Sequence, residues 1–342
     1  MSARSAATPA ALHAAHPLTY AALAAGVLIV STASILIRWA QAEGVPSIAI
    51  AAWRLTIAAL VLAPLVALRC SGELRALPAP HWKLALASGV FLALHFASWI
   101  LSLQYTSVAS SVALVTTNPI WIALFSVLVL RERMPALRLA AVVLALCGSG
   151  VILWADSGAF EVAAVATVAA DGASGAVASA PVTSPVATSS ATFGNLLALA
   201  GSLTVCGYLL IGRRLRESMS LLAYIGIVYG CAALCLLLAA VVSGAALWGY
   251  TTTAWLCLIG MALGPQLRGH SAFNYALKHV TPTTIALAVL GEPVGSALLA
   301  WLLFGEAISV VKLGGMALLL GGIFLAAKSE GGSRESLARE RQ

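Results

Sequence analysis

The feature that most constrains this chain is a series of apolar stretches, each long enough to cross a membrane. A helix crosses roughly 30 Å of hydrocarbon in about 20 residues. The stretches are too long, and alternate too little, to be strands of a membrane barrel. The sequence therefore predicts an all-α polytopic membrane protein with ten transmembrane helices. They are expected at residues 19–41, 47–68, 82–103, 107–130, 136–155, 193–212, 220–242, 251–277, 281–304 and 308–327.

Composition argues against most other classes of protein. The chain is 61% hydrophobic and 9% charged, whereas soluble domains carry about 25% charged residues. Soluble enzymes, nucleic-acid-binding proteins and disordered scaffolds are therefore disfavoured. The six cysteines form no C-x-x-C pair, so neither a disulfide framework nor a metal site is expected, and no cofactor is implied.

The basic residues indicate how the chain is oriented in the membrane. If the N-terminus is cytoplasmic, 15 of the 19 Lys and Arg residues fall in cytoplasmic segments, as the positive-inside rule requires. We therefore expect a multi-pass protein of the bacterial cytoplasmic (inner) membrane with both termini in the cytoplasm.

An internal repeat divides the chain into two halves. At one constant spacing, Pro119 pairs with Pro293 and Glu132 with Glu306. These matches are informative because Pro and Glu are rare here. An odd number of spans per half means that the second half crosses the membrane in the opposite sense. The sequence thus predicts a five-plus-five inverted repeat, typical of secondary transporters whose substrate site lies between the halves.

The domain organisation follows from this repeat. A stretch rich in Ala, Val, Ser, Thr and Gly separates the halves. It is either a substrate-capturing loop or, as its low complexity favours, a weakly ordered linker. The expected segments are a cytoplasmic tail (1–18), a first repeat (19–155), an external linker (156–192), a second repeat (193–328) and a cytoplasmic tail (329–342).

Ionisable groups within the spans are candidates for function because they are costly in hydrocarbon. Glu292 is the only acid well inside a span. It could bind a substrate ammonium, carry a coupling proton, or lock helix packing through a hydrogen bond. Its repeat partner is the uncharged Asn118. Arg54, about 10 Å deep in its helix, could pair with a substrate carboxylate or with helix carbonyls.

Other polar groups share helix faces. His95 and Trp99 lie four residues apart and could form an aromatic wall beside a titratable group, although a lone histidine is more often a packing residue. Trp121 lies on the face of the following span. The most polar span contains His270 and Asn274 on one face, which favours a water-filled cavity.

The paired prolines mark interruptions in two spans. Pro119 and Pro293 each lie about midway along a span, where a proline frees a carbonyl and can kink the helix. Corresponding interruptions in the two halves of a transporter point to its binding site. We predict helix kinks at both prolines; a purely structural role stays open.

Two stretches resemble a known family. LALHFASWILSLQYTSVASSVALVTTNPIWIALFSVLVLRER (92–133) and GPQLRGHSAFNYALKHVTPTTIALAVLGEPVGSALLAWLLFGE (264–306) resemble corresponding helices of the drug/metabolite transporter (DMT) superfamily, EamA type. The resemblance covers both halves and includes P-x(12)-E in each. It implies a ten-helix secondary carrier, often an exporter of amino acids or other small metabolites. By resemblance, six residues match the family in type: Arg54, His95, Trp99, His270, Asn274 and Glu292.

Two features depart from this pattern. Arg268 stands where the family usually has an apolar residue, and the linker at 156–192 is unusually long. The first leaves the local polarity open, and the second says little about transport.

These observations lead to one functional expectation. The chain is expected to be a secondary active transporter, and more specifically an exporter of small polar metabolites such as amino acids or drugs, working by alternating access. It lacks the H-E-x-x-H, G-x-S-x-G and P-loop motifs of common enzyme classes, so no enzymatic activity is expected. A facilitative carrier, or a non-transporting membrane protein, is the alternative. Protons are the expected coupling ion, no nucleic-acid partner is expected, and a homodimer is left open.

Specific roles are expected for ten residues. Glu292 and His95 are the candidates for proton coupling. Pro119 and Pro293 are the candidate kinks. Substrate contact is assigned to Arg54, His95, Trp99, Asn118, Trp121, His270 and Asn274.

Overall fold

The computed structural model describes residues 17–105, 111, 114–128, 135–156, 188–304 and 310–339. In this part of the chain every regular element is a helix. The first half contains α1 (Pro17–Val30), α2 (Ala33–Ala42), α3 (Ser47–Arg69), α4 (Ser71–Ala76), α5 (Ala79–Ser102), α7 (Asn118–Leu128) and α8 (Ala136–Asp156). The second half contains α10 (Thr188–Leu215), α11 (Leu221–Val242), α12 (Thr252–Met261), the π-helical η1 (Ala262–His270), α13 (Ser271–Ala276), α14 (Pro282–Val289), α15 (Glu292–Phe304) and α16 (Val310–Arg339). The predicted linker lies largely outside the described residues.

A described helix occurs at each of the ten predicted spans. Five helical segments are long and apolar enough to cross a membrane: Pro17–Ala42, Ser47–Arg69, Ala79–Ser102, Thr192–Leu215 and Leu221–Val242. The other predicted spans contain α7, α8, the series α12–η1–α13, the pair α14–α15, and α16. The short helix α4 was not predicted, because so short a segment cannot show a hydrophobic period.

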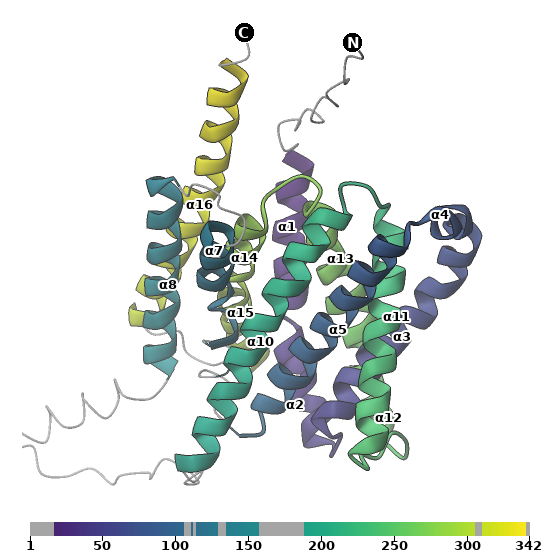
Figure 1. Cartoon of the computed structure of the whole chain (residues 1–342). Coiled ribbons are helices and arrows are strands. Elements are labelled where there is room, and N and C mark those ends of the chain that lie inside the picture. The colour runs from purple at the N-terminus through teal and green to yellow at the C-terminus, as the bar shows by residue number, and fades with distance from the viewer. Residues whose placement is uncertain are drawn as a thin grey trace, which may run out of the picture.

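The two halves run in opposite directions through the bundle. Figure 1 shows α1, which opens the first half, starting at the upper end, whereas α10, which opens the second half, starts at the lower end. The packing has a matching symmetry: α5 packs on α10 as η1 and α13 pack on α1. Two pairs of repeat counterparts also pack on each other, α3 on α11 and α8 on α16, and α7 packs on α14. This arrangement is that of two inverted repeats related by a pseudo-twofold axis.

Individual contacts repeat across this axis in step with the sequence matches. A Cβ added to Gly201 of α10 would lie 3.5 Å from the carbonyl oxygen of His95 on α5. A Cβ added to Gly26 of α1 would lie 3.3 Å from the carbonyl oxygen of Gly269 on η1. The two carbonyl partners stand 174 residues apart, like the paired prolines, whereas the two glycines stand 175 apart, so the first helix of each repeat is offset by one residue. Small residues let the backbones approach equally closely on both sides.

A hydrogen-bonded contact is repeated in the same way. The hydroxyl of Ser31, the residue directly after α1, donates to the carbonyl of Glu292 at 3.2 Å. The Cys206 thiol of α10 donates to the carbonyl of Asn118 at 3.6 Å, within the longer range expected for sulfur. Each side chain thus binds the first residue of a helix in the other repeat, Glu292 of α15 or Asn118 of α7.

The pseudo-twofold axis also relates the two sides of the contact between α8 and α16. A Cβ added to Gly148 would lie 2.7 Å from the carbonyl oxygen of Gly315, and one added to Gly322 would lie 2.8 Å from that of Ala141. Gly148 corresponds to Gly322, and Ala141 to Gly315, at the repeat spacing. The predicted all-α fold with two inverted repeats is confirmed.

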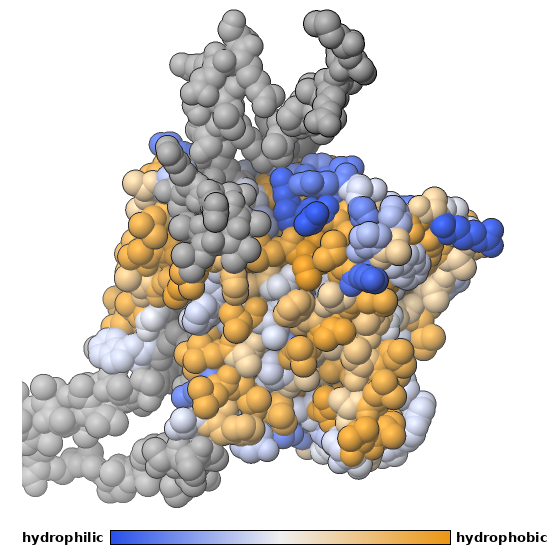
Figure 2. Space-filling model, in the orientation of Figure 1, coloured by the Kyte–Doolittle hydropathy of each residue, from blue (hydrophilic) through white to orange (hydrophobic). Residues whose placement is uncertain are grey.

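The outer surface of the bundle is apolar. Large hydrophobic side chains on several helices point away from the core, including Leu68 on α3, Val242 on α11 and Phe324 on α16. Figure 2 shows orange side chains over most of the visible face and a group of blue ones toward the end where α1 starts. Hydrocarbon is the solvent that suits such a surface.

Candidate functional site

Two broken helices meet near the pseudo-twofold axis. α14 ends at Val289 and α15 begins at Glu292, while α7 begins at Asn118 after a turn. Pro119 and Pro293 are therefore the second residues of these helices, where a missing N–H costs nothing. At each predicted kink the helix is interrupted by two turn residues, 116–117 and 290–291, which keep making turn hydrogen bonds. The breaks give Asn118 and Glu292 equivalent places at helix N-termini, where unpaired N–H groups favour negative charge.

A small cavity of about 50 Å³ lies where these helices begin. This is room for only a few water molecules, so the helices must separate before a metabolite could enter. Five of the predicted site residues line it: His95, Trp99, Asn118, His270 and Glu292. The remaining lining residues are Val30, Val115, Thr116, Val205, Tyr208, Leu209, Phe273, Ile285 and Val289.

His95 and Trp99 form one wall of this cavity. Their rings are stacked, with centroids 6.0 Å apart and planes 15° apart. His95 Nδ1 lies 2.9 Å from the carbonyl oxygen of Gly201. Because a carbonyl only accepts, Nδ1 must carry the proton, which leaves Nε2 as the nitrogen that gains or loses one. The two rings thus form an aromatic wall beside a titratable group.

Several polar atoms around the cavity have no hydrogen-bond partner. In the described part of the chain these include Trp99 Nε1, Asn118 Oδ1 and His270 Nδ1, all inaccessible to solvent. Buried polar atoms in proteins are nearly always paired. A cluster of exceptions at one cavity indicates a place where a ligand or ordered water completes the hydrogen bonds.

Arg54 lies behind the cavity rather than on its wall. Its side chain is fully buried, and its Nε donates to Gln266 Oε1 at 2.8 Å. Its guanidinium carbon lies 4.2 Å from the centre of the Phe96 ring, a cation–π contact. Phe96 also meets His270 with ring centroids 5.3 Å apart.

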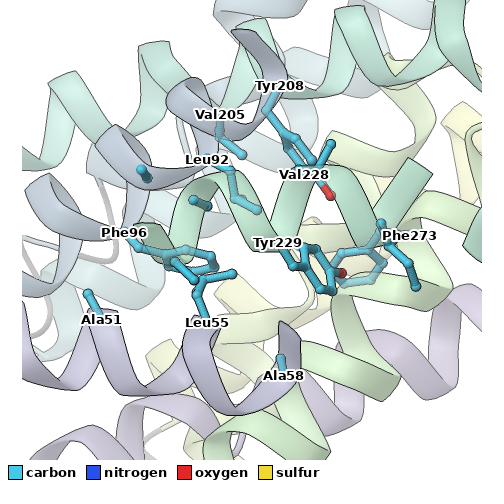
Figure 3. Close-up of a cluster of buried hydrophobic side chains, with 14 of the residues drawn as sticks. Ala51, Leu55, Ala58, Leu92, Phe96, Val205, Tyr208, Val228, Tyr229 and Phe273 are labelled. Carbon is cyan, nitrogen blue, oxygen red and sulfur yellow. The ribbon is translucent and has the colours of Figure 1, made fainter. Parts of the chain in front are cut away.

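Asn274 also acts from behind the wall. The Tyr208 hydroxyl donates to Asn274 Oδ1 at 2.7 Å, and Asn274 Nδ2 reaches the Tyr229 hydroxyl at 3.3 Å. Asn274 therefore positions Tyr208, which does line the cavity. Figure 3 shows Tyr208 and Tyr229 in the cluster of buried side chains that also contains Phe96 and Phe273.

Trp121 does not belong to this arrangement. Its indole Nε1 donates to Thr117 Oγ1 on the preceding turn at 3.2 Å, and it is not among the residues that line the cavity.

Sequence reasoning missed Tyr208 and the pairing of Gln266 with Arg54. Tyr208 is a lone phenol in an apolar helix, and Gln266 directly follows Pro265 in the most polar span. Each can be recognised in the sequence as a polar residue within an apolar span. Their positions in the sequence, however, do not indicate which side chain each one contacts.

The shape of helix η1 explains how this polar span is accommodated. Residues Ala262–His270 form a π-helix around Pro265, whereas the repeat-related α5 is a regular α-helix throughout. A π-helical turn is wider than an α-turn and is often found at functional sites. Here it holds Gln266 and His270 inside the bundle, while Arg268 points outward.

A second, larger cavity of about 540 Å³ lies between α1, the pair α14–α15, and α16. Its lining is apolar apart from Tyr20 and Thr284, and it includes the outward-facing Leu28 and Phe324. Such a surface suits hydrocarbon rather than a polar ligand. The polar candidate site is therefore the small central cavity. Within the described residues no three His, Cys, Asp or Glu side chains are grouped to hold a metal.

Two inverted helical repeats that meet at a cavity beside interrupted helices are typical of transporters. The chain belongs to the EamA-like transporter family, whose sequence profile matches residues 18–154 and 192–328. The predicted resemblance is confirmed.

Two individual proteins are also similar to this chain. An uncharacterized transporter of Archaeoglobus fulgidus is 30% identical over 73 residues. That match spans 21% of this chain and 27% of the relative. A solved crystal structure superposes with a TM-score of 0.68 at 20% identity, covering 90% of this chain and 96% of the other. At that identity the likeness shows the fold alone.

Proposed function

We propose that this EamA-family transporter is a secondary active exporter of small polar metabolites, such as amino acids or drugs, and that it works by alternating access. The observation that carries the proposal is the central cavity, because residues from both repeats line it, among them the titratable side chains of His95 and Glu292. The substrate would bind between the repeats, near the middle of the membrane.

The pseudo-twofold packing supports alternating access. The close contact of α10 with α5 at Gly201 and that of α1 with η1 at Gly26 are repeat-related. Because the contacts are repeat-related, either pair can part while the other stays closed, at similar cost. Parting of one pair would open the cavity to one side of the membrane, and parting of the other would open it to the opposite side.

Glu292 and His95 are the proposed proton-coupling groups. Both line the same small cavity, so a substrate ammonium and a proton would compete for Glu292. Trp99, Asn118 and His270 would contact the substrate directly. In this conformation Asn274 would act through Tyr208, and Trp121 makes no contact with the cavity.

The proposed orientation places both termini in the cytoplasm of a bacterial cell. Arg69 ends α3, and Arg213 and Arg214 end α10, at the end of the bundle where α1 starts (Figure 1). Clustered basic residues favour the cytoplasmic side. A cysteine introduced by Glu217→Cys tests this orientation with a membrane-impermeant thiol reagent. Labelling only after cell lysis would support cytoplasmic termini, whereas labelling of intact cells would show the opposite orientation.

Counterflow in proteoliposomes tests the proposed function. Protein is reconstituted with a panel of unlabelled amino acids inside, and uptake of each labelled compound is measured with and without a pH gradient. We expect transport that the gradient accelerates, and Glu292→Gln should lose that acceleration.

The matched control is Glu217→Gln, which changes the same groups at an exposed position (side chain 65% exposed). It should transport like the unaltered protein. Gradient-independent transport that Glu292→Gln retains in full would instead indicate a facilitative carrier.

A further inference from the structure

Arg54 has an unusual hydrogen-bond balance for a buried cation. A guanidinium carries five N–H donors, and here only Nε–H is used, in the bond to Gln266. Nη1 and Nη2 are buried and have no partner in the described part of the chain. Four donors on one fully buried charge are therefore unpaired.

The charge itself is also uncompensated by a direct ion pair. Among the described residues the only ion pair within 4.0 Å joins Arg213 and Glu217, and Glu292 acts on Arg54 only from a longer range. Removing one partner from a buried ion pair costs about 3–5 kcal/mol, so a buried cation without an anion is a costly arrangement. The cation–π contact with Phe96 offsets only part of that cost.

Gln266 adds a further unpaired donor beside Arg54. Its Oε1 accepts from Arg54 Nε, while its Nε2 is buried without a partner. The hydrogen bond holds the amide and the guanidinium next to each other. A planar fork of N–H donors with an adjacent amide N–H matches the two oxygens of a carboxylate.

The Phe96 ring separates this donor group from the cavity. The ring lies against the Arg54 guanidinium, and it also contacts the rings of His95 and His270, at centroid distances of 4.9 and 5.3 Å. Both histidines line the cavity, whereas Arg54 and Gln266 do not. A change in the Phe96 rotamer would remove the ring from between the donor group and the cavity.

We propose that Arg54 and Gln266 form a carboxylate subsite of the transport pathway, and that Phe96 covers it in this conformation. The subsite makes a carboxylate a required group of the substrate. It deepens the proposed function and rests on it. There is one such subsite, because the repeat-related positions of Arg54 and Gln266 are Val228 and Leu92.

Binding of an isosteric pair of probes tests the subsite without requiring transport. Phe96→Ala leaves a space about the size of a phenyl ring, so benzoate and benzamide are compared by the thermal stability of the purified variant. Benzoate should bind about tenfold or more tightly than benzamide, because only benzoate brings an anion to Arg54. Adding Arg54→Gln to Phe96→Ala should abolish this preference. Equal binding of both probes to Phe96→Ala would overturn the proposal.

A transport measurement keeps the proposal testable if Phe96→Ala does not fold. Counterflow of a transported amino acid is compared with that of its amide in the unaltered protein and in Gln266→Leu. The unaltered protein should strongly prefer the acid, and Gln266→Leu should reduce the preference about tenfold. Transport of acid and amide at equal rates would refute the subsite while leaving the transport function standing. If the protein transports nothing but Phe96→Ala still prefers benzoate, the subsite stands and the transport function is refuted.

Discussion

The two repeats can be compared position by position. At the contacts between helices they agree: Gly26 approaches the carbonyl of Gly269 as Gly201 approaches that of His95. Ser31 bonds the carbonyl of Glu292 in the manner in which Cys206 bonds its own partner. Ser31 and Cys206 differ in side chain, but the distances of approach are alike in both pairs.

Around the cavity the repeats differ. The buried polar residues Arg54, Gln266, Tyr229 and Asn274 belong to one side of the pseudo-twofold axis. At the repeat spacing set by the paired prolines, the corresponding residues are Val228, Leu92, Leu55 and Ile100. The difference shows that packing is held symmetric, as exchange between two conformations requires, whereas binding groups are placed once, as an asymmetric substrate requires.

The largest expected effect comes from breaking the symmetric packing. Gly148→Leu and Gly322→Leu should each destabilise the protein by about 3 kcal/mol or more, because the added side chain meets backbone atoms that cannot rotate away. The two variants should lose folded protein to a similar extent in fluorescence-detected size exclusion.

Matched controls lie on the same helices. A Cβ at Gly150 of α8 or Gly314 of α16 would meet nothing within 4 Å. Gly150→Leu and Gly314→Leu should therefore express as well as the unaltered protein. A tolerated Gly322→Leu beside a damaging Gly148→Leu would contradict the symmetry of this contact.

The next effect tests the asymmetry of the cavity. Exchanging the two helix-start residues, with Glu292→Asn and Asn118→Glu in one protein, keeps the composition and places the acid on the other repeat. Gradient-driven transport should fall about 100-fold, which corresponds to about 2.7 kcal/mol, because Arg54 and Gln266 lie on one side only. Recovery of transport in the double variant, relative to Glu292→Asn alone, would mean that either repeat can hold the acid.

A smaller effect is expected at Gln266 and its counterpart. Gln266→Leu removes the single hydrogen bond of Arg54 and should cost about 2 kcal/mol of stability, since hydrogen bonds to charged groups contribute about 1.5–3 kcal/mol. Leu92→Gln should also destabilise, by about 1–3 kcal/mol, because it buries an amide among apolar neighbours. Thermal unfolding in detergent measures both. A stabilising Leu92→Gln would show that the apolar side can also hold polar groups.

The smallest effect concerns the two ends of the bundle. Arg213 of α10 donates to the carbonyls of Leu277 and Val280 beyond α13. Arg38 of α2 is the repeat counterpart of Arg213, at the 175-residue spacing that also relates Gly26 to Gly201. Its side chain is exposed. Arg213→Gln should cost about 1 kcal/mol, and Arg38→Gln should change stability by less than about 0.5 kcal/mol. Equal losses of thermal stability would indicate that both ends are fastened alike.

Much of the fold could be predicted because hydrocarbon thickness sets span length and the prolines mark the repeat. Pro119 and Pro293 also located the helix breaks, although sequence could not distinguish a break from a kink. The π-helical form of η1 was beyond prediction, because Pro265 alone is compatible with several local distortions.

The cavity was predicted in part for a similar reason. His95 and Trp99 share a face of one helix, so their spacing placed them together. Tyr208 and Asn274 lie far apart in the sequence, and their hydrogen bond depends on how α10 packs against α13. The position of Arg54 behind Phe96 likewise depends on packing between α3 and α5, which no local pattern records.

Substrate protection of the cavity tests its role most directly. Val205 of α10 and Val289 of α14 line it from different helices. Each is replaced by cysteine in a protein whose six native cysteines have been removed, with Glu217→Cys as an exposed control. A compound that shows counterflow should slow alkylation of both cavity cysteines several-fold and leave the control unchanged. Unchanged alkylation at Val205→Cys and Val289→Cys, with counterflow intact, would contradict a substrate site between the repeats.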